Sequence, residues 1–170
     1  KQMIEAAGGI ALEVKEGNKG DAAIMVSCDL LCISNDMLRM VREEVGKKNK
    51  VLDVSKIFLS ATHTHTAPVL ENDSNFSFRY LIPEKGVLQP EEYVSFFVKK
   101  VSEAINTAWE SRKPGSVTWG LSHAAVAYNR RIVYADGTSV MYGNTNKPDF
   151  MNLEGMEDHD VNTLFFWNED

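Results

Sequence analysis

The sequence predicts a mixed α/β fold in which helices flank a mixed sheet. Between residues 21 and 61 a strand pattern, a helical pattern and a second strand pattern follow one another, an order typical of a parallel crossover unit. Amphipathic spacing over residues 90–109 and several apolar runs after residue 116 indicate the same class. The length of 170 residues fits one domain, and the hydrophobic share of 44% is ordinary for a folded chain.

The first predicted elements are two strands joined by a turn. Residues 9–16 lead into the turn sequence Gly-Asn-Lys-Gly, and an apolar run at residues 21–31 follows it. Because that run is rich in Ala, Ile, Met and Val, we expect a strand that is buried on both faces. The even spacing of Cys28 and Cys32 places them on the same side of such a strand, so we expect two buried thiols.

A helix and a short strand are predicted next. Ser34 is suited to an N-cap, and apolar side chains recur at helical spacing from residue 37 to residue 45. Lys47 and Lys48 are basic, and basic side chains are favourable at the C-terminus of a helix, which is the negative end of its dipole. The helix is therefore predicted to end there. The apolar run at residues 57–61 predicts the strand that completes the crossover unit.

A long polar segment, residues 66–89, separates this strand from the second helix. A loop of that length inside a domain is expected to be functional or flexible. Its aromatic residues form an apolar lip for a lipid chain, or they pack onto the loop itself. They are Phe76, Phe78 and Tyr80. Pro90 suits the first position of the second helix, whose apolar stripe runs to Trp109.

The last third of the chain predicts strands only. Residues 117–128 form one long strand, residues 132–134 and 140–142 form a hairpin around an Asp-Gly turn, and residues 161–167 form a final strand. A turn-like sequence follows that last strand, and nothing seals the edge of the sheet. We therefore expect the chain to be an incomplete piece of a larger domain.

Charge and hydropathy exclude two classes of partner. The chain has 18 basic and 24 acidic residues, a net charge of −6, whereas proteins that bind nucleic-acid backbones need a basic stripe. No stretch approaches the roughly 18 consecutive apolar residues of a membrane span. We expect neither a nucleic-acid partner nor a transmembrane segment. The start at Lys1, without a basic and apolar leader, fits a processed product or a piece of a longer protein.

Two histidines predict a metal site at the carboxyl end of the strand at residues 57–61. His63 and His65 alternate with Thr62 and Thr64, and in extended backbone residues i and i+2 point to the same face. Ligand sites of α/β sheets lie at this edge, neutral imidazole is a zinc ligand, and nearby hydroxyls can orient the rings. The sequence shows no third or fourth ligand. The alternative is two exposed or capped histidines that bind no metal.

Two further polar residues, Asp29 and Arg130, are candidates for supporting roles. Asp29 follows a buried strand, where it orients a metal-binding imidazole or caps the next helix. Arg130 holds a hydroxyl, carboxylate or phosphate of a substrate, or it forms a surface ion pair. His123 is expected on a strand surface, and His159 is expected in an acidic loop.

Four pieces of the chain, in sequence order, resemble the neutral/alkaline non-lysosomal ceramidases. Residues 25–30 are similar to the Val-Ser-x-Asp-Leu strand of that family. Residues 61–68, Ala-Thr-His-Thr-His-Thr-Ala-Pro, resemble its Thr-His-Thr-His-Ser-Gly-Pro signature. Asn129-Arg130 resembles its Asn-Arg-Ser-Pro motif, and residues 160–167 resemble the Asp-x-x-x-x-Leu strand that follows. The resemblance spans roughly residues 9–167.

The resemblance implies an enzyme that hydrolyses an amide bond with one zinc ion. It implies that His63 binds the zinc, that His65 lies beside the metal and stabilises the reacting carbonyl, and that Arg130 lies at the substrate site. The other ligands of the family, a His, a Glu and a Tyr, and its catalytic Ser are expected beyond residue 170. Residues 1–170 are then the N-terminal portion of the catalytic domain. A secreted, periplasmic or cell-surface location is implied as well.

Departures from the family motifs widen the expected substrate from ceramide to related amides. Thr66 and Ala67 stand where the family has Ser-Gly, and Ser-Pro is missing after Arg130. Both changes fall where substrate is expected, so we predict a zinc-dependent hydrolase of an N-acyl, sphingolipid-like amide. Two alternatives stay open. One is a catalytically silent module that binds lipid or carbohydrate, and the other is an amidohydrolase-type metal enzyme, in which a His-x-His also follows a strand.

Overall fold

The computed structural model describes residues 8–16, 19–70 and 82–168. Within it the chain divides into two compact units, Lys1–Arg112 and Lys113–Asp170, and each is described by itself. The mixed α/β class is confirmed, because both helices and strands are present. Among these residues no helix combines the length and the apolar character that a bilayer span requires.

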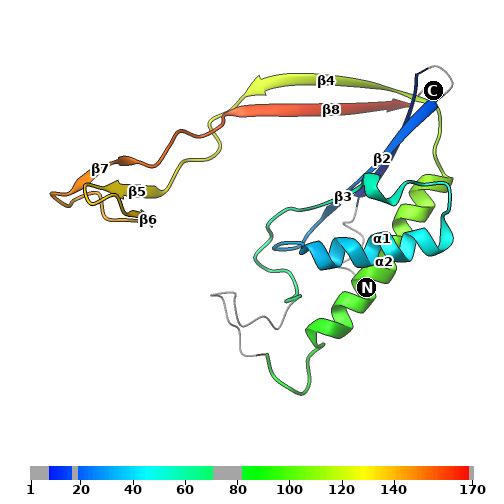
Figure 1. The fold of residues 1–170 in the computed structure, drawn as a ribbon, viewed down its shortest axis with the longest axis horizontal. Helices are drawn as coiled ribbons and strands as arrows, with labels where there is room; N and C mark the ends of the chain where they lie inside the picture. The colour runs from blue at the N-terminus through cyan, green and yellow to red at the C-terminus, as the bar shows by residue number, and fades with distance from the viewer. Residues whose placement is uncertain (1–7, 17–18, 71–81, 169–170) are drawn as a thin grey trace. The chain divides into compact units, whose positions relative to one another are not determined.

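The first unit contains a three-stranded mixed sheet in the order β1-β2-β3 (Figure 1). Strand β1 (Gly8–Glu16) is antiparallel to β2 (Lys19–Cys28), and β2 is parallel to β3 (Ile57–Ala61). A parallel pair needs a crossover connection, which the helix between β2 and β3 supplies. The predicted strand, helix and strand unit is therefore confirmed.

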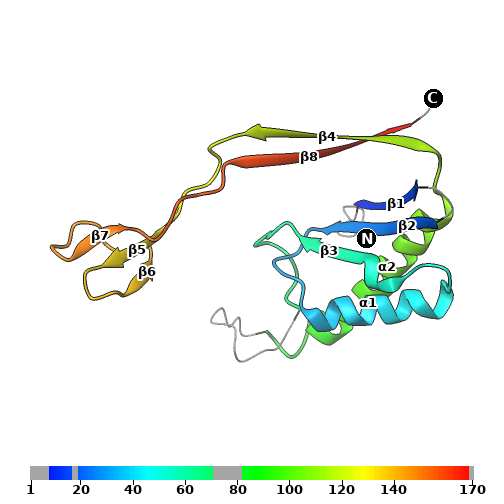
Figure 2. The ribbon, with the colours of Figure 1, turned by 45° about the horizontal axis from the view of Figure 1, so that its top comes forward.

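Two α-helices lie on one face of this sheet (Figure 2). Helix α1 (Asn35–Lys48) is capped by the preceding Ser34, whose hydroxyl accepts from the backbone N–H of Met37 at 3.3 Å, so the predicted N-cap is confirmed. Helix α2 (Pro90–Glu110) has Pro at its first turn, and the carboxylate of Glu92 accepts from the N–H of Gln89 at 3.1 Å. A short 3-10 helix, η1 (Val54–Lys56), precedes β3.

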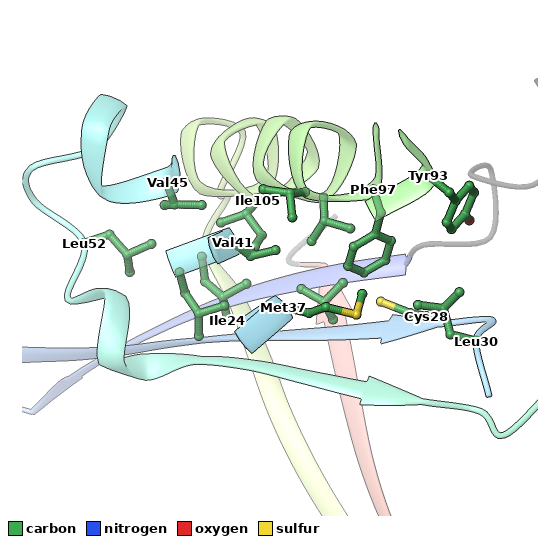
Figure 3. Packing of buried hydrophobic residues seen from close by; sticks show 14 residues of the cluster. Ile24, Cys28, Leu30, Met37, Val41, Val45, Leu52, Tyr93, Phe97 and Ile105 are labelled. Atoms are coloured by element: carbon green, nitrogen blue, oxygen red, sulfur yellow. The ribbon is translucent and has the colours of Figure 1, made fainter. Parts of the chain in front are cut away.

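The core of the first unit lies between the helices and the sheet (Figure 3). Ile24 of β2, Val41 of α1 and Ile105 of α2 are fully buried in one cluster. Along β2 buried residues alternate with exposed ones, and Met25 is 49% exposed. The prediction that this strand is buried on both faces is wrong, because both described helices pack on the same face.

The two cysteines have different surroundings. Cys28 ends β2 with its side chain in the core, whereas Cys32 is exposed. The chain turns directly after β2, where the N–H of Leu30 donates to the carbonyl of Cys28 at 2.8 Å. The two positions therefore do not share one strand, and the prediction of two buried thiols is wrong for Cys32.

Alkylation is expected to separate the two thiols. Burial raises the pKa of Cys28 to about 11, and the neighbouring carboxylate of Asp29 adds to the increase. The thiolate is the reactive species, so at pH 8 we expect iodoacetamide to modify Cys28 at least about a hundredfold more slowly than an ordinary thiol. Mass spectrometry should find Cys32 modified first, and both in urea. Rapid labelling of native Cys32→Ser protein would contradict this.

The second unit consists of two separate sheets. Strands β4 (Gly115–His123) and β8 (Asp160–Asn168) form an antiparallel ribbon, and β5 (Arg131–Tyr134) lies between β6 (Ser139–Met141) and β7 (Phe150–Leu153). The predicted hairpin of β5 and β6 is confirmed. Three sheets replace the single sheet that we expected. No crossover helix is described after residue 112, and all the strand pairs described there are antiparallel: β4 with β8, and β5 with both β6 and β7.

Two strand predictions in this unit need correction. The long strand predicted at residues 117–128 ends at His123, because Ala124 begins a turn in which its carbonyl accepts from the N–H of Val126 at 3.0 Å. Strand β7 was not predicted. It has only four residues, Phe-Met-Asn-Leu, which is too short to show a reliable alternation.

Candidate functional site

The His-x-His segment leaves β3 at the carboxyl end of the parallel strand pair. Cys28 and Ala61 are paired at the ends of β2 and β3, so both strands end at the same edge. Beyond that pair, the N–H of Thr62 donates to the carbonyl of Cys28 at 3.0 Å, and the N–H of Thr64 donates to the carbonyl of Leu30 at 3.1 Å. These bonds connect the histidine segment to the last residue of β2 and to the turn that follows it, at the sheet edge where the sequence predicts the site.

The two imidazole rings lie together, although the backbone differs from the prediction. Their centroids are 5.0 Å apart and their planes are inclined by 79°. The segment is not extended, since His63 has a left-handed φ of 64° and a turn follows at residues 65–66. The prediction of extended backbone is therefore wrong, whereas the two rings do lie together. A left-handed residue other than glycine costs about 1–3 kcal/mol and is concentrated at functional sites.

The backbone orients the ring of His63. Its Nδ1 lies 2.8 Å from the carbonyl oxygen of Leu31. A carbonyl only accepts hydrogen bonds, so Nδ1 carries a proton, and the tautomer of the neutral ring is the one with its lone pair on Nε2. The residue is exposed, so that lone pair can bind a metal ion or accept a proton. Leu31 was missed by the sequence analysis, because a contribution from a main-chain carbonyl leaves no side-chain signal.

The predicted supporting residues bind one another. The hydroxyl of Thr62 donates to Oδ1 of Asp29 at 3.1 Å, and it lies 2.8 Å from the hydroxyl of Thr64. Because Thr62 gives its proton to the carboxylate, Thr64 is the donor in the second bond. Asp29 therefore positions Thr62 rather than an imidazole, and the cap of α1 is Ser34, so neither expected role of Asp29 is found. The described bonds of the two threonine hydroxyls join Thr62 to Asp29 and Thr64 to Thr62.

The histidine pair is at most a part of a metal shell. Within residues 8–16, 19–70 and 82–168 no group of three or more His, Cys, Asp or Glu side chains is placed to hold an ion. In the second unit His123 is exposed at the end of β4, with Nδ1 2.7 Å from Asp160, and His159 is half-buried in the loop before β8. The aromatic residues expected to form a lip, Phe76, Phe78 and Tyr80, lie outside the described residues.

Arg130 lies in the second unit, directly before β5. Its Nη1 donates to the hydroxyl of Tyr142 at 2.5 Å, and its guanidinium carbon lies 5.1 Å from the centroid of that ring. Asn129 anchors this segment, since its side chain accepts from the N–H of Arg131 at 2.9 Å and donates to the carbonyl of Gly155 at 3.1 Å. Arg130 belongs to the second unit and the histidine pair to the first, and each is described within its own unit. Tyr142 was missed by the sequence analysis.

Comparison with known proteins identifies no relative: no protein-family model matches the chain, no curated protein matches it, and no solved structure matches its fold.

Proposed function

We propose that this chain carries part of the active site of a zinc-dependent hydrolase that cleaves the amide bond of an N-acyl, sphingolipid-like substrate. One observation carries the proposal: the 2.8 Å bond between Nδ1 of His63 and the carbonyl of Leu31. Zinc-binding histidines donate their second ring N–H to a carboxylate or a backbone carbonyl in this way, which selects the tautomer whose Nε2 binds the metal. The resemblance of residues 61–68 to the ceramidase signature supports the same role for His63.

Each residue around the histidine turn has its own role in the proposed hydrolysis. The chemistry that zinc supplies when bound is Lewis acidity toward a carbonyl and a lowered pKa of water, to about 7. The bond to the carbonyl of Leu31 holds the ring of His63 in place for the ion. The ring of His65, whose centroid is 5.0 Å away, presents an N–H that can stabilise a developing oxyanion. Thr62, Thr64 and Asp29 keep the turn in shape through their hydroxyl and carboxylate bonds.

The remaining zinc ligands and the nucleophilic machinery are expected outside this chain. This follows from the ceramidase resemblance, and it agrees with the incomplete metal group in the described residues. The second candidate function is a catalytically silent module that binds lipid or carbohydrate. A location outside the cytosol belongs to the enzyme proposal, because enzymes of this class act on lipids there.

Elemental analysis and an amide substrate panel test the proposal on the full-length protein. We expect about one zinc ion per chain and hydrolysis of an N-acyl sphingoid base that stops when dipicolinate removes the metal and returns when zinc is added. The amount of fatty acid released measures the reaction. A protein that contains no zinc and cleaves none of the amides would sink the enzyme proposal. Lipid or glycan binding by that metal-free protein would then support the silent module.

A further inference from the structure

The cation of Arg130 differs from its neighbours in having no carboxylate partner among the described residues. The next residue, Arg131, is neutralised by Glu154, with Nε 2.6 Å from a carboxylate oxygen. Glu157, the other acid close to this segment, accepts a hydrogen bond from the backbone N–H of Asn129. Arg130 is exposed and directs one N–H to the neutral hydroxyl of Tyr142. One unit of positive charge is therefore left unbalanced at this point.

The contact between Arg130 and Tyr142 leaves hydrogen-bond donors facing outward. A guanidinium has five N–H donors and no acceptor, so the phenolic oxygen of Tyr142 must be the acceptor in their 2.5 Å bond. The O–H proton of Tyr142 is then free to be donated elsewhere. The pair presents several donors and a single positive charge, which suits a group that has only acceptor atoms.

The backbone holds Tyr142 in this position at a cost. Tyr142 has a left-handed φ of 57°, which is unfavourable for an aromatic residue. Its N–H donates to the carbonyl of Arg130 at 2.7 Å, and the next residue, Gly143, packs so closely that a Cβ there would lie 2.6 Å from the hydroxyl of Tyr134. These contacts outweigh the strain and leave the Tyr142 side chain 71% exposed beside Arg130.

From this geometry we propose that Arg130 and Tyr142 form a binding site for a carboxylate group. A carboxylate is planar and accepts two parallel bonds from the guanidinium fork. Its single charge matches the one unbalanced cation, whereas a phosphate monoester carries about −1.5 to −2 at pH 7 and would be only partly neutralised. This inference goes beyond the proposed function, because it stands on the contacts of Arg130 and Tyr142 within the second unit alone.

Direct binding tests the site without relying on hydrolysis. The probes are N-acetylglycine, its neutral amide N-acetylglycinamide and inorganic phosphate, each titrated into the labelled full chain at pH 7.5. The NMR signals of the Arg130 side chain and the Tyr142 ring report occupancy. We expect N-acetylglycine to bind about tenfold more tightly than the neutral amide, since hydrogen bonds between charged groups are the stronger ones. Phosphate should bind more weakly than N-acetylglycine.

Variants separate the roles of the two residues. Arg130→Gln is expected to abolish binding of N-acetylglycine, and Tyr142→Phe, which keeps the ring and loses the O–H donor, is expected to weaken it about three- to tenfold. Tyr128→Phe is the matched control, because Tyr128 is 75% exposed in the same unit, and it should bind like wild type. Equal affinity for the acid and its amide, or tighter binding of phosphate, would overturn the carboxylate assignment. If these binding results hold and no amide is cleaved, the proposed hydrolase fails while the site stands.

Discussion

Replacing His63 with alanine is expected to remove the zinc ion from the protein and to lower amide hydrolysis by more than about a hundredfold. The ring uses Nδ1 to bind the carbonyl of Leu31, so its only free nitrogen is the proposed metal ligand. Loss of a group that merely orients a ligand costs roughly 10- to 100-fold in metal affinity or activity, and loss of the ligand itself should cost more. Zinc per chain and kcat on an N-acyl amide are the two measurements.

The variant His65→Ala should respond differently from His63→Ala. We expect it to keep its zinc and to lose about 10²- to 10³-fold in kcat, the usual effect of removing one oxyanion donor. His123→Ala is the matched control, since this exposed histidine contacts Asp160 in the other unit, and it should change neither quantity. If both site variants retain zinc and full turnover while folded, the assignment of this turn as the active site is wrong.

The sequence predicted best where one residue acts on its own backbone neighbours. Ser34 as the cap of α1 and Pro90 in the first turn of α2 depend on local chemistry, so the sequence alone predicts both. The parallel pair of β2 and β3 followed from the order of elements. The edge at which His63 and His65 lie followed from that topology.

The finer geometry of the site depended on contacts that sequence patterns do not encode. Periodicity gives the face of a strand only while the backbone stays extended, and His63 departs from it with a left-handed φ. Tyr142 meets Arg130 across 12 residues through a turn held by the close packing of Gly143, and no local motif signals such a contact. Cys32 was misplaced for the same reason, because β2 ends at Cys28.

The core of the first unit provides the prediction with the largest expected effect on stability. Ile105 is 0% exposed in α2 and belongs to the cluster that joins α1, α2 and β2, as Figure 3 shows. Ile105→Ala removes buried carbon atoms and leaves a cavity that rigid neighbours fill only in part. We expect the free energy of unfolding to fall by about 3 kcal/mol, within the usual range of about 2–5 kcal/mol for such substitutions.

Urea unfolding followed by circular dichroism at 222 nm measures this change in the first unit, because both described α-helices lie there. Val51→Ala is the matched control, since Val51 is 84% exposed in the same unit, and it should alter the free energy of unfolding by less than about 0.5 kcal/mol. The two variants test whether packing between α1, α2 and β2 stabilises the unit. A loss below about 1 kcal/mol for Ile105→Ala would contradict the role of this packing in the stability of the unit.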